Sequence, residues 1–95
     1  MITSKERAYL RSLANDIQPI IHLGKEGISG NLIKQVDDAL EARELVKATV
    51  QQNSEYDART ACEELAKATN AEPVQCIGRK FVLYRASKNN PRIGF

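Results

Sequence analysis

The residues of this chain best suited to chemistry form a short loop bounded by two glycines, Gly24-Lys25-Glu26-Gly27. The loop follows a short apolar run and precedes a helical pattern, so its backbone N–H groups lie where a helix begins. Such N–H groups have no partner inside the helix and, together with the helix dipole, favour a bound phosphate. The glycines let a second backbone approach closely because no Cβ intervenes. An ordinary strand-to-helix turn has the same pattern, and Glu26 opposes an anion, so the motif alone leaves both interpretations open.

A second candidate is the basic segment that runs from Gly78 to Arg85. Arg79 and Lys80 lie at a predicted hairpin connection, and Tyr84 precedes Arg85 at the end of the last predicted strand. Cations beside an aromatic ring suit RNA, which is held by phosphate contacts and by stacking of bases. The alternative is that these charges only protect an exposed edge strand from pairing with other sheets.

The histidine and the two cysteines do not form a predicted catalytic or metal site. His22 lies in an apolar run and is predicted to be partly buried and hydrogen-bonded. Cys62 and Cys76 fall among apolar residues, where a thiol acts as a small hydrophobic group. The sequence has no ATP-binding phosphate loop, no dinucleotide fingerprint and no metal-ligand spacing. We therefore expect no enzyme, no metal and no cofactor.

Charge is distributed unevenly along the chain. The 14 Lys and Arg residues and 12 Asp and Glu residues give a net charge of only +2. Residues 35–64 nevertheless carry −5, and residues 78–95 carry +5. Such a dipolar molecule can attract a polyanion to one side. The chain also lacks a secretory signal and an apolar run of the ~20 residues that cross a bilayer, so we expect a cytoplasmic protein that binds no membrane. Nothing in the sequence demands a dimer, so we expect a monomer.

Hydrophobic periodicity predicts three helices and four strands in the order α-β-α-β-α-β-β. The helices are predicted over 4–14, after Ser29 and around 58–69, and the strands over 19–23, 45–51, 74–77 and 81–85. This order predicts an α/β two-layer sandwich with a mixed four-stranded sheet. With helices on one side only, the other sheet face would expose Lys47, Thr49 and Gln51. Residues 1–86 are predicted to form one domain, and 87–95 a loose basic tail.

Four segments of the chain, in this order and spacing, resemble the CRM domain, which is named for chloroplast RNA splicing and ribosome maturation. They are KERAYLRSLA (5–14), QPIIHLGKEGIS (18–29), ELVKATV (44–50) and VQCIGRKFVLYR (74–85). The resemblance covers about residues 3–86 and is strongest to the stand-alone bacterial members, the YhbY type.

The resemblance implies an RNA-binding fold similar to the C-terminal domain of a bacterial translation initiation factor. It also implies that Gly24, Lys25, Glu26 and Gly27 form a Gly-x-x-Gly loop like that of KH modules, which clamp nucleotides. Bacterial members of the family are associated with the precursor of the large ribosomal subunit, and plant relatives act in intron splicing. The implied basic surface comprises Arg11, Lys25, Lys34, Lys47, Arg79, Lys80 and Arg85.

Three functional hypotheses follow from the sequence. The first is a non-catalytic protein that binds ribosomal RNA during assembly of the large (pre-50S) subunit. The second is a protein-binding adaptor that uses an open sheet face and acidic helices. The third, which the residues argue against, is a small enzyme that uses Cys62 and His22.

Overall fold

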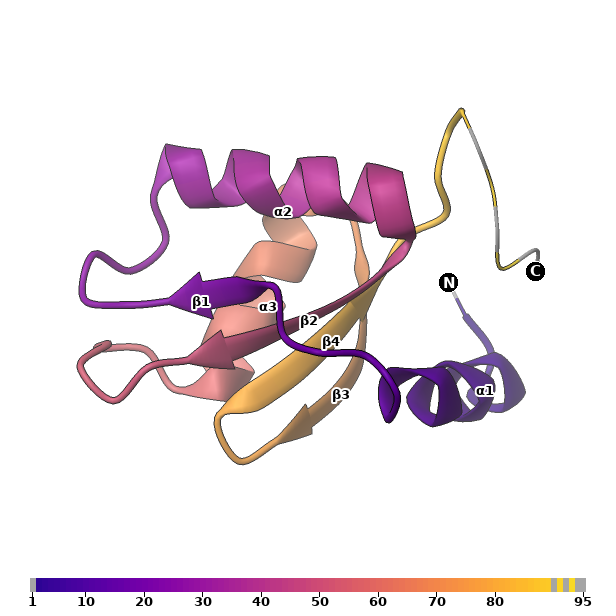
Figure 1. The fold of residues 1–95 in the computed structure, drawn as a ribbon, viewed down its shortest axis with the longest axis horizontal. Helices are drawn as coiled ribbons and strands as arrows, with labels where there is room; N and C mark the ends of the chain where they lie inside the picture. Colours follow the sequence, from indigo (N-terminus) through magenta and orange to yellow (C-terminus); the bar gives the residue numbers. More distant parts are fainter. Residues whose placement is uncertain (1, 90, 92, 94–95) are drawn as a thin grey trace.

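A computed structural model of the chain describes residues 2–89, 91 and 93, and its elements follow the predicted order (Figure 1). The helices and strands are α1 (Ser4–Ala14), β1 (Ile21–Leu23), α2 (Gly30–Arg43), β2 (Leu45–Val50), α3 (Ala58–Thr69), β3 (Glu72–Ile77) and β4 (Lys80–Tyr84). None of the helices formed by the described residues is long and apolar enough to cross a bilayer.

The four strands form one mixed sheet in the order β1-β2-β4-β3. β1 and β2 are parallel and are joined by α2, whereas β4 pairs antiparallel with both β2 and β3. The predicted α/β fold with a mixed four-stranded sheet is thus confirmed. The carboxyl ends of β1 and β2 meet at one end of the sheet, where the β1–α2 and β2–α3 loops also lie (Figure 1).

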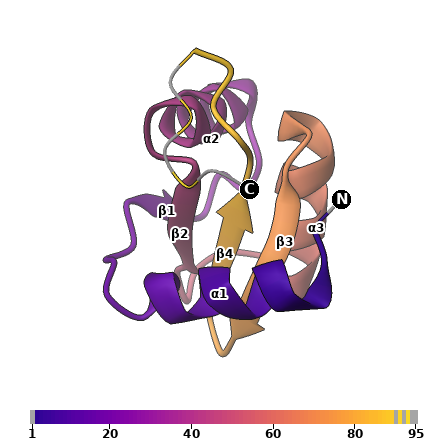
Figure 2. The same ribbon diagram turned by 90° about the vertical axis from the view of Figure 1, so that its right-hand side faces the viewer.

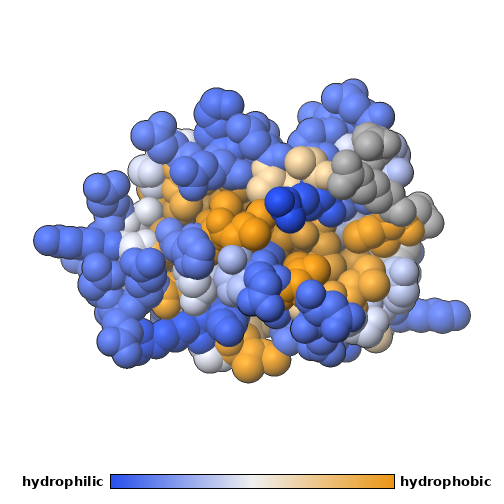
Figure 3. Space-filling model, in the orientation of Figure 1, coloured by the Kyte–Doolittle hydropathy of each residue, from blue (hydrophilic) through white to orange (hydrophobic). Residues whose placement is uncertain are grey.

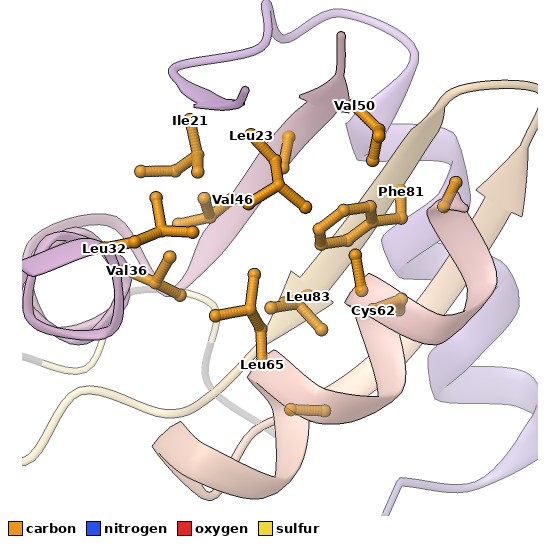
Figure 4. Packing of buried hydrophobic residues seen from close by; sticks show 14 of the residues in the cluster. Ile21, Leu23, Leu32, Val36, Val46, Val50, Cys62, Leu65, Phe81 and Leu83 are labelled. Carbon is orange, nitrogen blue, oxygen red and sulfur yellow. The ribbon is translucent and has the colours of Figure 1, made fainter. Parts of the chain in front are cut away.

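The main core lies between one face of the sheet and the helices α2 and α3 (Figure 4). β2 alternates as predicted, since Val46, Ala48 and Val50 are buried on this face. The helix predicted around 58–69 is also confirmed, and α3 buries one stripe of six residues: Ala58, Ala61, Cys62, Leu65, Ala66 and Thr69. Period two in strands and 3.6 in helices identify these residues because both elements bury only one side.

The second face of the sheet is covered at one end only, by α1 (Figure 2). Leu10 and Ala14 of α1 pack there against apolar residues of three strands: Leu45, Val74, Val82 and Tyr84. Helices are therefore not confined to one face, because α1 has an apolar stripe of its own to bury. The other end of this face, which includes Lys47 and Thr49, remains half-exposed.

Local capping explains where the helices begin and end. Thr3 and Glu6 exchange hydrogen bonds in a capping box at α1, and the Ser29 hydroxyl accepts from the Leu32 N–H at α2. Asn70 ends α3 in the left-handed conformation, with φ of 59°. Glu44 ends α2 at φ of 65° although it is not glycine.

The segment after β4 is held against the end of α2 by two carboxylates. Glu44, which is fully buried, accepts from the N–H groups of Ser87 and Ile93 at 2.7 and 2.8 Å. Glu41 accepts from the Ser87 hydroxyl and from the N–H groups of Lys88 and Asn89. Hydrogen bonds therefore hold these described residues in place, whereas the sequence predicts a loose tail. Local sequence patterns do not reveal the contact because Glu41 and Glu44 are remote from this segment in the chain. Residues 90, 92, 94 and 95 of that predicted tail lie outside the described residues.

Candidate nucleic-acid interface

The glycine-bounded loop is a tight turn that requires glycine most strictly at its second end. The Gly27 N–H donates to the Gly24 carbonyl at 3.1 Å, and Gly27 has φ of +71°, which side chains disfavour. A Cβ on Gly27 would lie 2.9 Å from the ring of Tyr56. A Cβ on Gly24 would meet only the end of the Gln51 side chain, at 3.0 Å. The loop is therefore shaped by Gly27 and Tyr56, while Gly24 leaves room beside the backbone.

The loop and the start of α2 present N–H groups without protein acceptors. Within the described residues, the N–H groups of Lys25 and Glu26 at the exposed tip donate to no protein atom. The same holds for Gly30 and Asn31 in the first turn of α2, whereas the N–H of Leu32 is taken by the Ser29 side chain. These donors and the helix dipole are suited to an anion, as the sequence predicts for this position.

A groove of about 500 Å³ runs beside the loop. Its walls are polar and come from the loop, the first turns of α2 and the ends of β1 and β2: His22, Asn31, Gln35 and Gln51 with the apolar Leu32. Polar residues also cover this end of the molecule in the space-filling view (Figure 3). Imidazole and amide side chains can donate to or accept from phosphates and base edges.

His22 is exposed, whereas the sequence predicts a partly buried and hydrogen-bonded residue. Ile21 and Leu23 point into the main core, so period two places His22 on the second sheet face, where it is exposed. The prediction of a partly buried histidine is therefore wrong. Cys62 lies in the main core, so the sheet separates it from His22. Burial raises the pKa of the Cys62 thiol to about 11, which disfavours a nucleophilic thiolate.

The β3–β4 turn places two further cations at the loop end of the sheet. Gly78 has φ of +60°, and the carbonyl of Arg79 accepts from the Val50 N–H at 2.7 Å, which ties the turn to the end of β2. Arg79 and Lys80 are both exposed. Gln51 lines the groove beside the loop and also a hollow that Arg79 lines, so it lies between the two candidate regions.

The remaining predicted cations are dispersed. Lys47 is half-exposed on the second face of β2, and Lys34 on α2 pairs with Asp38 at 3.2 Å. Arg11 is exposed on α1, at the other end of the molecule from the loop (Figure 1). The structure thus gathers Lys25, Arg79 and Lys80 at the loop end and separates Arg11 from them.

Arg85 has a structural position that makes it unsuitable as a ligand contact. Its side chain is only 14% exposed and pairs with Asp37 at 2.5 Å. It also donates to the carbonyls of Thr69 and Asp37 at 2.7 and 3.1 Å, which joins the end of α3 to α2. The prediction that Arg85 belongs to a ligand-binding surface fails because this pairing spans segments far apart in sequence.

The described residues include no cluster of three or more His, Cys, Asp or Glu side chains that could hold a metal ion. The geometry that remains is a polar groove, a loop with available amides and nearby cations. That arrangement can bind an anionic chain by its backbone.

A family model for the CRS1/YhbY (CRM) domain matches residues 2–85. The chain belongs to this family. It is 46% identical over 93 residues to the "Probable RNA-binding protein YqeI" of Bacillus subtilis, covering 98% of this chain and 97% of the relative. It is 29% identical over 87 residues to a Haemophilus influenzae protein named "RNA-binding protein", covering 92% and 88% of the two chains.

A solved structure supports the fold of this CRM family member. The solution structure of a hypothetical protein from Staphylococcus aureus matches with a TM-score of 0.79 and 52% identity. The match covers 95% of this chain and 94% of the other. The resemblance inferred from the sequence motifs is therefore confirmed for the family and for the fold.

Proposed function

We propose that this chain is a non-catalytic RNA-binding protein whose Gly24–Gly27 loop holds phosphates of the bound strand. The observation that carries the proposal is the set of loop and helix N–H groups without protein acceptors, beside the exposed Lys25. The family relatives from Bacillus subtilis and Haemophilus influenzae are named as RNA-binding proteins, and these names do not describe enzymes. Backbone amides contact phosphate whatever the base, so this loop supplies affinity more than sequence preference.

The cations nearest the loop would provide the sequence-independent attraction. We include Lys25, Arg79, Lys80 and Lys47 in this surface because they are exposed or half-exposed at the loop end or on the adjoining sheet face. Lys34 contributes less because Asp38 offsets its charge. Glu26 at the loop tip repels phosphate and so limits the affinity for RNA. Removal of this one carboxylate should therefore raise the affinity.

We further propose that the RNA is ribosomal RNA of the large subunit, bound while the particle assembles. Support comes from the resemblance of the chain to bacterial CRM proteins associated with that precursor. Sequencing of RNA crosslinked to the protein in cells tests this step, and crosslinks that fall outside large-subunit RNA and its precursor would refute it.

RNA binding by the loop is tested by fluorescence anisotropy with a labelled single-stranded RNA at several salt concentrations. We expect Lys25→Ala to weaken binding and to reduce the salt slope by about 0.7, the counterion released per neutralised phosphate of a single strand. Lys67→Ala is the matched control, because Lys67 is an exposed cation in the last turn of α3. Equal losses in the two variants, or a salt-independent affinity, would contradict the loop as the binding element.

A further inference from the structure

The open end of the second sheet face carries one continuous row of side chains across all four strands. The register aligns His22 of β1 with Thr49 of β2, Thr49 with Lys80 of β4, and Lys80 with Ile77 of β3. Paired residues point to the same face, and His22 lies opposite the main core. With strands about 4.8 Å apart, the row is roughly 14 Å long.

The residues of this row are accessible. His22 and Lys80 are exposed, Thr49 is half-exposed, and Ile77 is 65% exposed, an unusual state for an isoleucine within a strand. A hollow beside the row is lined by Lys47, Gln75, Ile77 and Lys80. The row and this hollow contain two lysines and, among their described residues, no carboxylate.

The row is continuous with the groove at the glycine loop, because His22 belongs to both. A nucleic-acid strand held at the loop could instead continue over the β2–α3 loop. That path passes the exposed carboxylates of Glu55 and Asp57. A hydrogen bond from the Thr60 N–H lowers the pKa of Asp57 and keeps it charged. A polyanion is therefore repelled from the β2–α3 loop and attracted toward the row.

We propose that a single-stranded RNA segment held at the Gly24–Gly27 loop continues across the second sheet face, over His22, Lys80 and Ile77. This inference rests on the proposed function and adds to it the path of the RNA over the protein and the requirement that the RNA is single-stranded. At about 3.4 Å per stacked nucleotide, the row accommodates about three or four nucleotides. Lys47 and Lys80 neutralise their phosphates.

The chemistry of the row suits unpaired bases. Ile77 offers an apolar surface to the face of a base, and Thr49 and Gln75 offer hydrogen-bonding groups to its edge. In a double helix the base faces are stacked inside, so the contact of Ile77 with a base face favours a single strand. α1 covers the opposite end of this face, so the row lies on the part that α1 leaves open (Figure 2).

The test compares three RNA probes by anisotropy: a tetranucleotide, a single strand of ~12 nucleotides and a duplex of the same sequence. The variants are the double substitution Lys47→Ala/Lys80→Ala and, separately, Ile77→Asp. We expect the double variant to lose about tenfold affinity for the longer strand and to lower its salt slope by about 1.4, from two lost phosphate contacts. Its affinity for the tetranucleotide, which the loop can hold, should fall much less than its affinity for the longer strand.

The matched control is Lys5→Ala/Lys67→Ala, which removes the same charge from exposed positions of α1 and α3. Circular dichroism of each variant checks that it is folded. Unchanged binding of the longer strand by the Lys47/Lys80 variant, while Lys25→Ala still weakens it, would overturn the path and leave phosphate binding by the Gly24–Gly27 loop intact. Equal or tighter binding of the duplex by the wild type would overturn the single-strand assignment. Absence of RNA binding by the wild type would refute the proposed function itself.

A protein partner on the same face is the rival outcome. A partner that is retained after nuclease treatment and lost on Ile77→Asp would overturn the RNA path. Lys80 of the row and Lys47 of the hollow beside it favour the polyanion instead.

Discussion

The two ends of α2 differ in whether nearby backbone N–H groups find an acceptor within the protein. At the C-terminal end, Glu41 and Glu44 accept from four backbone N–H groups and one hydroxyl of the segment after β4. At the N-terminal end, the N–H groups of Lys25 and Glu26 have no protein acceptor among the described residues. Both regions are irregular and polar, but only at the C-terminal end do carboxylates of the protein accept from these N–H groups. The C-terminal end of α2 is thus a structural contact, and the difference supports the proposal that the N-terminal end binds an external anion.

The largest expected effect comes from breaking the contact at Glu44. Glu44→Ala should lower the free energy of unfolding by about 3 kcal/mol, because the N–H groups of Ser87 and Ile93 lose their acceptor at a buried position. Urea unfolding measures the loss, with Glu63→Ala on the exposed side of α3 as control. RNA affinity of the folded variant should equal that of the wild type. A stability change as small as that of the control would show that the contact is not energetically important.

The second-largest expected loss of stability comes from a substitution in the glycine loop. Gly27→Ala and Gly78→Ala both place a side chain at positive φ, which costs about 1–2 kcal/mol. Only the Cβ at position 27 also meets a ring, that of Tyr56, so Gly27→Ala should lose about 1 kcal/mol more than Gly78→Ala. Thermal unfolding of the two variants measures this difference. Equal losses would mean that Tyr56 moves freely away.

These outcomes also bear on what the sequence can and cannot predict. The strand alternation of Val46, Ala48 and Val50 and the stripe of α3 were predictable, because one-sided burial leaves a regular period. The loop was predictable from Gly24 and Gly27. The second-face position of His22 was also accessible from period two, but the apolar character of its neighbours concealed it.

Pairings between distant segments were not predictable from local patterns. Arg85 has the composition of a ligand contact, yet it pairs with Asp37, 48 positions away in sequence. Glu41 and Glu44 hold a segment more than 40 positions away that resembles a free tail. Similarly, the position of α1 on the second face depends on which strand surface remains apolar after the sheet has formed. Only the assembled fold decides such contacts.

A smaller, pH-dependent effect tests the second acid of the contact at the C-terminal end of α2. Hydrogen bonds, first from the Ser87 hydroxyl and then from the Lys88 and Asn89 N–H groups, lower the pKa of Glu41 from 4.5 to about 2. A lowered folded-state pKa stabilises the fold above the unfolded pKa and loses that effect as pH falls through the folded pKa. The wild type should therefore be more stable than Glu41→Gln at neutral pH, and the gap should close between pH 4.5 and 2. Urea midpoints across this range measure the gap, and a gap independent of pH would contradict the assignment.

The smallest expected change in stability is at Gly24. Gly24→Ala should alter the free energy of unfolding by less than about 0.5 kcal/mol, because the new Cβ meets only the flexible end of Gln51. Its RNA affinity should still fall several-fold, since the Cβ narrows the approach to the loop backbone. Anisotropy and urea unfolding of the same sample separate the two effects. Unaltered RNA affinity would place the bound strand away from this glycine.

The contact between Gly27 and Tyr56 also provides an intrinsic spectroscopic reporter. The chain contains three tyrosines and no tryptophan, so its ultraviolet emission comes from tyrosine alone. Tyr56 is half-buried and touches the loop, whereas Tyr9 and Tyr84 lie on α1 and β4. Occupation of the loop should therefore change the emission of the unlabelled protein, and Tyr56→Phe should abolish that change.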